Sequence, residues 1–487
     1  MLFNSIDFAI FLPIVFLLYW FVANKNLKLQ NLLIIISSYI FYGWWDWRFL
    51  ALILFSTLID YSVGVRLSSE ENTSKRKILL WTSIFVNLGF LGFFKYYNFF
   101  LDNFVSAFSF FGAEINGNSL NIILPVGISF YTFQTLSYTI DVYKKKLKPT
   151  KDFIAFSAFV SFFPQLVAGP IERATHLLPQ FHKKRTFNYE KAVDGLRQIL
   201  WGLFKKIVIA DNCAQYANEI FNNSADYSGS TLVLGALFFS FQIYGDFSGY
   251  SDIAIGTSRL FGFNLKQNFA FPFFSRDIAE FWRRWHISLS TWFRDYLYIP
   301  LGGSRGGTWN NVRNIFITFV VCGFWHGANW TFIAFGALHA FYFLPLLLTK
   351  SNRNNLNVVA QGRNLPTIKE LFSILLTFGL FVFSMMIFRA KSIGHAFQYI
   401  QDMFLGLFSK AGYIETISFF IFEVGFTIPI LLTVFILIEW FGREYQYAIE
   451  YLGVTWNRTL RNVLYYAIIL AIFLVGGEEQ QFFYFQF

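Results

Sequence analysis

Hydrophobic residues in this chain form long runs that are separated by short polar loops. The runs cover residues 5–23, 78–94, 122–140, 231–255, 371–388, 419–440 and 463–475. Several approach or exceed the roughly 20 residues that an α-helix needs to cross a hydrocarbon core of ~30 Å. The pattern predicts an all-α polytopic membrane protein. We expect one continuous domain over residues 1–487, because no low-complexity linker or internal repeat divides the chain.

Some apolar runs are too short to span a membrane comfortably. Residues 32–42 with 49–61, and residues 154–168, lie between basic loops on the same side, so hairpins or re-entrant segments fit them better. We expect roughly 11 to 13 membrane-embedded helices, including re-entrant and interfacial ones. Residues 5–23 are interpreted as a retained first span, since no Lys or Arg precedes the run and no small-residue cleavage site closes it.

Composition agrees with this fold class. The chain is 55% hydrophobic and 14% charged, which leaves too little polar surface for a soluble globule of this size. The net charge of +10 arises from Lys and Arg in short loops beside apolar runs, so it indicates membrane topology and lipid contact, with no nucleic-acid partner. With the basic loops in the cytoplasm, both termini are predicted to be extracytoplasmic. Two cysteines form no disulfide or zinc framework, and no metal is expected.

The first candidate for chemistry is His326, in the segment CGFWHGANW at 322–330. An apolar stretch starts near Asn314, so at ~1.5 Å per residue the imidazole would lie roughly 18 Å into the membrane. An ionisable group at such depth needs a partner or a water-filled cavity, and it marks a functional site by default. His326 suits general acid/base catalysis. The alternative is an imidazole that only ties helices together.

His339 follows 13 residues later. On one unbroken helix the two histidines would lie about 220° around the axis and ~20 Å along it from each other, so they could not share a site. A helix break near residues 327–329 would relax this constraint. We expect His339 to have a supporting or packing role.

Two carboxylates, Asp246 and Asp252, lie inside another apolar run. Ser248 and Asp252 would share a helix face if the nearby glycines permit a helix, whereas Asp246 would point elsewhere. Either carboxylate could orient a histidine or bind a cation. The alternative is an interhelical hydrogen bond without chemistry.

A segment rich in Trp and Arg covers residues 281–296. Its aromatic and apolar side chains fall on one helical stripe: Trp282, Trp285, Leu289, Trp292 and Tyr296. The stripe predicts a helix at the cytoplasmic interface. The nearby arginines are candidates for binding the phosphates of a cytosolic nucleotide cofactor. These are Arg283, Arg284, Arg294 and Arg305. The glycine-rich loop at 302–307 adds weak evidence, since it lacks the lysine and spacing of a P-loop.

The chain closes on the strongly aromatic sequence FFYFQF at 482–487. This end should emerge outside after the last span and then tuck back into the membrane or a groove. An interfacial anchor is the alternative. The sequence pattern alone does not assign chemistry to Tyr484.

Several motifs together resemble the bacterial branch of the membrane-bound O-acyltransferase family, of the AlgI type that O-acetylates polysaccharides. The motifs are LPVGISFYTFQ (124–134), FPQLVAGPI (163–171), DFSGYSD (246–252), FWRRWH (281–286), WHG (325–327) and FYFQF (483–487). They occur in the expected order, and the resemblance covers almost the whole chain.

The resemblance implies that His326 is the family's essential intramembrane histidine, and that Tyr484 holds the acyl group during transfer across the membrane. It places Asp246, Asp252, His339 and Arg305 in the family's polar motifs. It further implies acetyl-CoA as the donor, the bacterial inner membrane as the location, and a polysaccharide acceptor. An extracytoplasmic SGNH or serine-hydrolase-like acetyltransferase is the implied partner, consistent with the lack of a Gly-x-Ser-x-Gly motif here.

Two other functions remain open from the sequence. The same chemistry could acylate a lipid, a teichoic acid or a small alcohol. The chain could instead be an ion or solute transporter, with Asp246, Asp252 and His326 as coupling groups. The absence of repeats and the arginine cluster weigh against transport.

Overall fold

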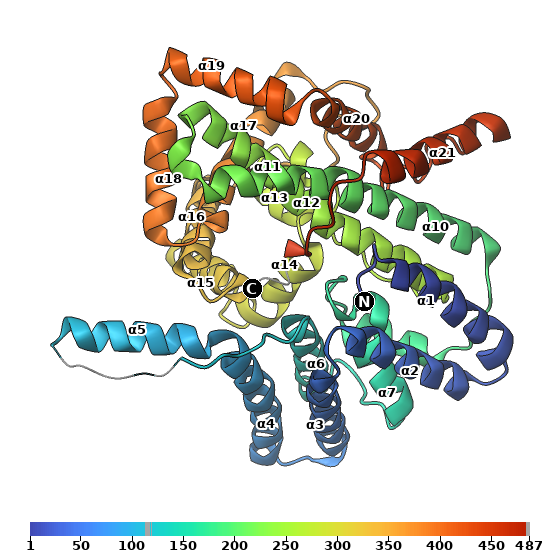
Figure 1. Cartoon of the computed structure of the whole chain (residues 1–487). Helices are drawn as coiled ribbons and strands as arrows, with labels where there is room; N and C mark the ends of the chain where they lie inside the picture. The colour runs from blue at the N-terminus through green and yellow to red at the C-terminus, as the bar shows by residue number, and fades with distance from the viewer. Residues whose placement is uncertain (113–116, 118, 484–487) are drawn as a thin grey trace. The chain divides into compact units, whose positions relative to one another are not determined.

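The computed structural model describes residues 1–112, 117 and 119–483, and this part of the chain is helical with no β-strand (Figure 1). The all-α prediction is thereby confirmed. The described residues divide into two compact units. One unit contains Met1–Gly195 and Thr257–Lys266, and the other contains Leu196–Gly256 and residues 267–483. A single domain over residues 1–487 stays a prediction.

The described residues of the first unit contain nine complete α-helices, the start of α10 up to Gly195, and the last residues of α12 (Gly229–Leu260) from Thr257. The helices before α12 are α1 (Ile6–Leu17), α2 (Leu27–Asp46), α3 (Leu50–Ser69), α4 (Thr73–Leu91), α5 (Tyr97–Phe110), α6 (Ile128–Tyr143), α7 (Phe153–Ser161), α8 (Phe163–Leu166), α9 (Ala174–Leu177) and the start of α10 (Tyr189–Leu203). Helix α3 packs against α4, α6 and α7. Polar side chains inside this packing satisfy one another, since buried Asp60 accepts hydrogen bonds from Ser83, Asn87 and Thr139.

Helices α2 and α3 are longer than their apolar runs. Each has 20 residues, and the joined stretch Leu27–Ser69 is long and apolar enough to cross a membrane. The helices are therefore longer than the runs suggested, and a hairpin or re-entrant arrangement of the two runs stays a prediction. Polar residues that flank the runs are part of the helices, because their side chains have hydrogen-bond partners inside the protein. Buried Asn31, for example, accepts a hydrogen bond from Arg185 at 2.7 Å. By contrast, residues 154–168 do form only two short helices, α7 and α8.

The second unit holds the remaining helices. They are the end of α10, α11 (Asp211–Asn222), α12 (Gly229–Leu260, up to residue 256), α13 (Ile278–Arg284), α14 (Ile287–Phe293), α15 (Thr308–His326), α16 (Trp330–Leu348), α17 (Ile368–Arg389), α18 (Ile393–Gly406), α19 (Lys410–Phe419), α20 (Thr427–Gly442) and α21 (Arg458–Leu474). A π-helical segment, Phe204–Ala210, joins α10 to α11. Helices α15 and α16 pack against each other extensively, and α16 also packs on α17.

Glycine and proline break two of the predicted spans. The run 122–140 contains Pro125 and Gly127, and Gly127 has a φ of +73°, so α6 begins only at Ile128. The run 419–440 is interrupted at Gly425, which has a φ of +66°, and α20 begins at Thr427. Left-handed backbone is sterically favourable chiefly for glycine and is incompatible with a continuing helix.

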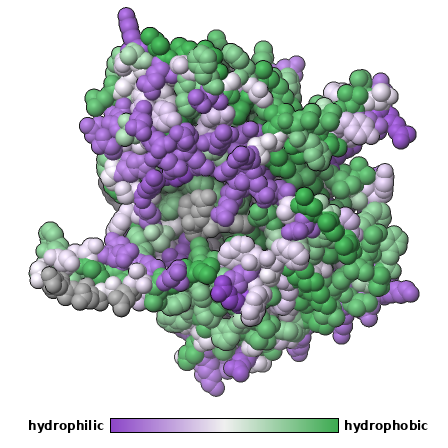
Figure 2. Space-filling view, viewed as in Figure 1, coloured by the Kyte–Doolittle hydropathy of each residue, from purple (hydrophilic) through white to green (hydrophobic). Residues whose placement is uncertain are grey.

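Six helical stretches in the described residues are long and apolar enough to cross a membrane, or seven if the bent stretch over α18 and α19 is one span. The expected number of 11 to 13 embedded helices therefore has to include shorter and more polar ones. Hydrophobic side chains cover wide areas of the face in Figure 2. The chain is a multi-pass membrane protein, because such a surface is stable against lipid and unfavourable in water.

Candidate active site

The α15–α16 hairpin places both histidines. Helix α15 ends at His326, and α16 begins at Trp330 after a cap in which Asn329 accepts a hydrogen bond from the Thr331 N–H at 3.0 Å. The break that would allow the two histidines to share one region is thus present at residues 327–329. The two helices pack closely at Gly336, which has no side chain: a Cβ on this residue would lie only 2.3 Å from the Phe319 carbonyl oxygen.

His326 lies in an aromatic environment and is only 4% exposed. Its ring centroid is 5.0 Å from that of Trp325, 5.4 Å from that of Phe388 and 6.2 Å from that of Phe335. His286 lies beyond Trp325, with ring centroids 6.0 Å apart.

His339 has both ring nitrogens engaged. The Trp282 indole N–H donates to Nδ1 at 3.1 Å, and Nε2 lies 3.0 Å from Ser384 Oγ. Ser384 donates its own proton to the Phe381 carbonyl, so the arrangement assigns the histidine proton to Nε2. His339 is fully buried, and its ring lies 4.5 Å from that of Phe335, which also contacts His326. This geometry ties α13, α16 and α17 together.

The two carboxylates lie on one continuous helix, α12, so the glycines do permit a helix there. Asp246 pairs with Lys206 at 2.8 Å, and Asp252 pairs with Lys205 and accepts from Gln198 Nε2 at 2.7 Å. Both lysines belong to the π-helical segment. Within the described part of the chain, no three His, Cys, Asp or Glu side chains gather as metal ligands.

The last described residues, 475–483, run from the end of α21 back toward the other helices of the second unit (Figure 1). We call them the C-terminal segment. The Gly477 N–H donates to the Ile207 carbonyl at 3.1 Å, and the Phe483 N–H donates to Asp246 Oδ2 at 2.7 Å. Phe483 packs against Phe388 with ring centroids 6.3 Å apart. Tyr484 lies outside the described residues.

The stripe over residues 281–296 is not one helix. It is split into α13 and α14, and His286 between them has a φ of +42°. Arg283 donates to the carbonyls of Asn352 and Asn355 at 2.9 and 2.7 Å. Burial lowers the pKa of the Arg283 guanidinium, although nearby carboxylates oppose that shift. Arg284 pairs with Glu280 at 2.9 Å. Arg284 also donates to the Asn357 carbonyl at 3.2 Å, so both arginines hold the loop after α16. Neither lines the cavity between that loop and α15.

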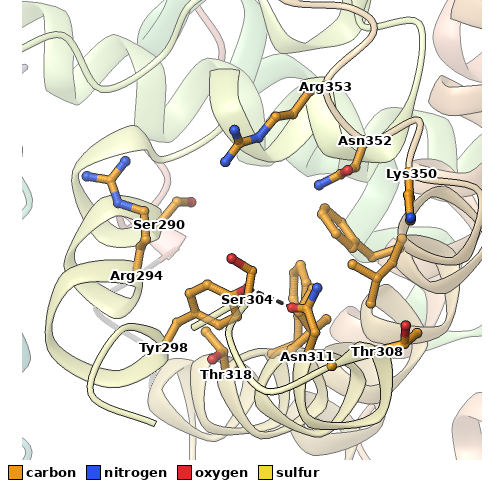
Figure 3. Close-up of a pocket in the computed structure, with 15 residues that line it drawn as sticks. Ser290, Arg294, Tyr298, Ser304, Thr308, Asn311, Thr318, Lys350, Asn352 and Arg353 are labelled. Carbon is orange, nitrogen blue, oxygen red and sulfur yellow. Dashed lines mark hydrogen bonds between the residues drawn. The ribbon is translucent and has the colours of Figure 1, made fainter. Parts of the chain in front are cut away.

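A cavity of about 620 Å³ lies between α14, α15, α16 and the loop after α16 (Figure 3). Three cations line it, namely Arg294, Lys350 and Arg353, together with neutral polar and apolar side chains. Arg353 and Asn352 project into it from the loop, and Tyr298 donates to Asn311 Oδ1 at 2.7 Å on the opposite wall. Of the four predicted arginines, only Arg294 lines this cavity, while Arg305 is exposed beside its lining residue Ser304.

One stripe of α15 leads from the cavity to His326. Ile315 and Phe319 line the cavity, and Cys322 and His326 follow on the same helix face as buried residues. The seven residues from Phe319 to His326 correspond to about 10 Å along the axis. Sequence reasoning missed Lys350 and Arg353, because no motif surrounds them.

Comparison with known proteins matches residues 144–388 to MBOAT, the membrane-bound O-acyltransferase family. The probable alginate O-acetylase AlgI of Azotobacter vinelandii is 40% identical, over 83% of this chain and 78% of its own length. The peptidoglycan O-acetyltransferase of Helicobacter pylori is 35% identical, over 83% and 80%. The teichoic acid D-alanyltransferase of Streptococcus thermophilus is 32% identical, over 46% and 57%. The chain is an acyltransferase and belongs to the membrane-bound O-acyltransferase family.

Proposed function

We propose that this acyltransferase moves an acetyl group from cytosolic acetyl-CoA through the bacterial inner membrane, for O-acetylation of an exported polysaccharide. The observation that carries the proposal is the α15 stripe, on which Ile315 and Phe319 line a cavity with three cations and His326 follows as a buried imidazole on the same helix face. Relatives named as an alginate O-acetylase and a peptidoglycan O-acetyltransferase support the acetyl group and the glycan acceptor.

The donor end of the site is the cavity. Arg294, Lys350 and Arg353 face it, and no carboxylate is among the described residues that line it. Arg294 Nε also donates to the carboxylate of its neighbour Asp295 at 2.8 Å. Such a surface suits the phosphates of coenzyme A, because guanidinium and ammonium groups form strong charge-assisted hydrogen bonds with phosphate oxygens. We infer that Arg305, an exposed neighbour of the lining residue Ser304, assists at the rim. Arg283 and Arg284 contribute by holding the loop that carries Arg353.

The reactive end of the site is His326. In the proposed step, the imidazole takes the proton of an acceptor hydroxyl as that oxygen attacks the thioester carbonyl. The new C–O bond forms, the C–S bond breaks, and the coenzyme A thiolate takes the proton back from the imidazolium. The acceptor hydroxyl is that of Tyr484. The position of Phe483 beside Phe388, whose ring contacts His326, supports this choice.

Asp246, Asp252 and His339 act in this proposal as positioning groups. His339 fixes α16 against α13 and α17, and each carboxylate holds a lysine of the π-helical segment. An extracytoplasmic acetyltransferase of the SGNH or serine-hydrolase type then collects the acetyl group and esterifies the polysaccharide. Both termini lie outside in this arrangement.

Purified protein in liposomes tests the proposal against transport and against other acceptors. We expect radiolabelled acetyl-CoA, added on the side of the cavity, to be consumed and its label to become covalently attached to protein. In the complete system, label should pass to an added polysaccharide when the extracytoplasmic partner is present. Flux of ions or sugars without consumption of acetyl-CoA would refute transfer. If the label passes to lipid, teichoic acid or a small alcohol and not to polysaccharide, that molecule is the acceptor.

A further inference from the structure

A cluster of three buried charged groups lies beside the C-terminal segment. Lys206 Nζ is 2.7 Å from Asp211 Oδ1 and 2.8 Å from Asp246 Oδ1. The exposed fractions of Lys206, Asp211 and Asp246 are 5%, 2% and 3%. Charges this deeply buried need close, well-oriented partners, so their geometry is tightly constrained.

The same cluster binds the backbone of the C-terminal segment at two points. Lys206 Nζ donates to the Gln480 carbonyl at 3.0 Å, and Asp246 Oδ2 accepts from the Phe483 N–H at 2.7 Å. Both bonds are assisted by a full charge, which makes them stronger than bonds between neutral groups. Because they engage main-chain atoms, they fix the path of the segment independently of its side chains.

The rings of the segment then align with the catalytic region. Phe482 packs against Tyr250 and Phe247 of α12, with ring centroids 4.9 and 6.0 Å apart. Phe483 packs against Phe239 at 5.0 Å and against Phe388 at 6.3 Å. The backbone clamp at residues 480 and 483 thus keeps the end of the described chain one aromatic ring away from His326.

We propose that Lys206 and Asp246 are positioning residues that hold the C-terminal segment beside Phe388 at the proposed transfer site. The proposal rests on the proposed function in its use of Tyr484 as the acyl acceptor. The proposal gives the buried ion pair of Lys206 and Asp246 a role, since these residues take no part in the acid/base chemistry proposed for His326. Loss of the clamp would free the terminus while leaving the donor cavity, which consists of other residues, unchanged.

The chain provides a matched control in the preceding residue. Lys205 is equally buried and lies in the same π-helical segment, but it pairs with Asp252. Its ammonium also lies 5.8 Å from the centre of the Tyr244 ring. Lys205→Met therefore removes a buried ion pair of the same kind, whereas Lys206→Met removes the pair that binds the C-terminal segment.

The test uses the full-length protein in lipid nanodiscs, digested with carboxypeptidase and followed by intact mass. We expect the C-terminal residues of Lys206→Met to be removed at least tenfold faster than those of the native chain or Lys205→Met. In acetyl-CoA turnover, kcat of Lys206→Met should fall at least tenfold while KM for acetyl-CoA stays within twofold. Lys206→Arg, which keeps the charge and donors, should recover part of both properties.

Digestion of Lys206→Met at the native rate, or equally fast digestion of Lys205→Met, overturns the proposal. If Lys206→Met does not fold, Asp246→Asn is the substitute, since it removes the charge with little change in shape, and the same outcomes apply. The two proposals fail separately. Full acetyl transfer by the Tyr484→Phe protein would reject Tyr484 as the acyl acceptor. The digestion rates decide separately whether Lys206 holds the C-terminal segment.

Discussion

The rings of His326 and Phe388 lie 5.4 Å apart, and Phe388 also contacts Phe483 of the C-terminal segment at 6.3 Å. One phenyl ring on α17 therefore touches both the proposed base and the chain that leads to the proposed acceptor. Phe388 is 3% exposed, so its ring is a fixed part of this wall.

Truncation of this ring should separate positioning from donor binding. We expect Phe388→Ala to lower kcat for acetyl transfer at least tenfold, because both neighbours lose their packing surface, while KM for acetyl-CoA stays nearly constant. A Phe→Ala change in a core costs about 3–5 kcal/mol of stability. Phe378→Ala on the same helix is the control, since Phe378 packs against Phe241 and Phe273. Equal losses of kcat in the two variants would contradict a specific role for Phe388.

The cations that line the cavity should affect the binding of acetyl-CoA and not the rate of acetyl transfer. Arg353→Gln is expected to raise KM for acetyl-CoA about tenfold, since a hydrogen bond to a charged group contributes about 1.5–3 kcal/mol. Its kcat should change less than twofold. Arg363→Gln is the control, because Arg363 pairs with Glu370 and does not line the cavity. Steady-state kinetics at several salt concentrations measures both constants, and an unchanged KM in Arg353→Gln would remove the cavity from the donor site.

His339 should behave as a positioning residue. His339→Phe leaves the Trp282 N–H and Ser384 Oγ without the imidazole partner, which costs about 1–3 kcal/mol for each buried group. We expect a lower unfolding temperature and weaker transfer, and partial recovery of both in His339→Gln, whose amide can accept and donate. An inactive His339→Gln protein with native thermal stability would instead indicate that the imidazole takes part in the chemistry.

A methyl group added at Gly336 should disrupt the close packing of α15 on α16. In Gly336→Ala the new Cβ would meet the Phe319 carbonyl oxygen, so the helices must separate. We expect about 1–3 kcal/mol of destabilisation, as is typical of overpacking, together with loss of activity. Gly379→Ala on α17 has no atom within 4 Å of its new Cβ and should be neutral or slightly stabilising. Thermal unfolding in detergent compares the two, and equal stability would contradict the packing argument.

The predictable part of the site is the part that local sequence encodes. Gly327 and Asn329 signal the helix break after His326, and the structure has it there. Helix α15 nevertheless starts at Thr308, before the apolar run, because Asn311 and Asn314 are satisfied by Tyr298 and by the Gly303 carbonyl. Side-chain partners outside the helix thus extended it beyond what hydrophobicity indicated.

The cavity could not be predicted, because its cations come from segments far apart in the chain. Arg294 follows α14, whereas Lys350 and Arg353 lie in the loop after α16, where no spacing or motif marks them. Arginine clusters in sequence were a weaker guide, since Arg283 and Arg284 have protein groups as partners. The ion pairs of Asp246 and Asp252 with neighbouring lysines likewise depend on the meeting of α12 with the π-helical segment.

In the proposed reaction, His326 activates a hydroxyl of this chain for attack on the donor thioester. The direct measurement is peptide mass spectrometry after incubation with isotopically labelled acetyl-CoA, for the native protein, His326→Ala and Tyr484→Phe. We predict label on the peptide containing Tyr484 in the native protein and its loss in both variants. Unchanged labelling of the His326→Ala protein would show that His326 is not the base.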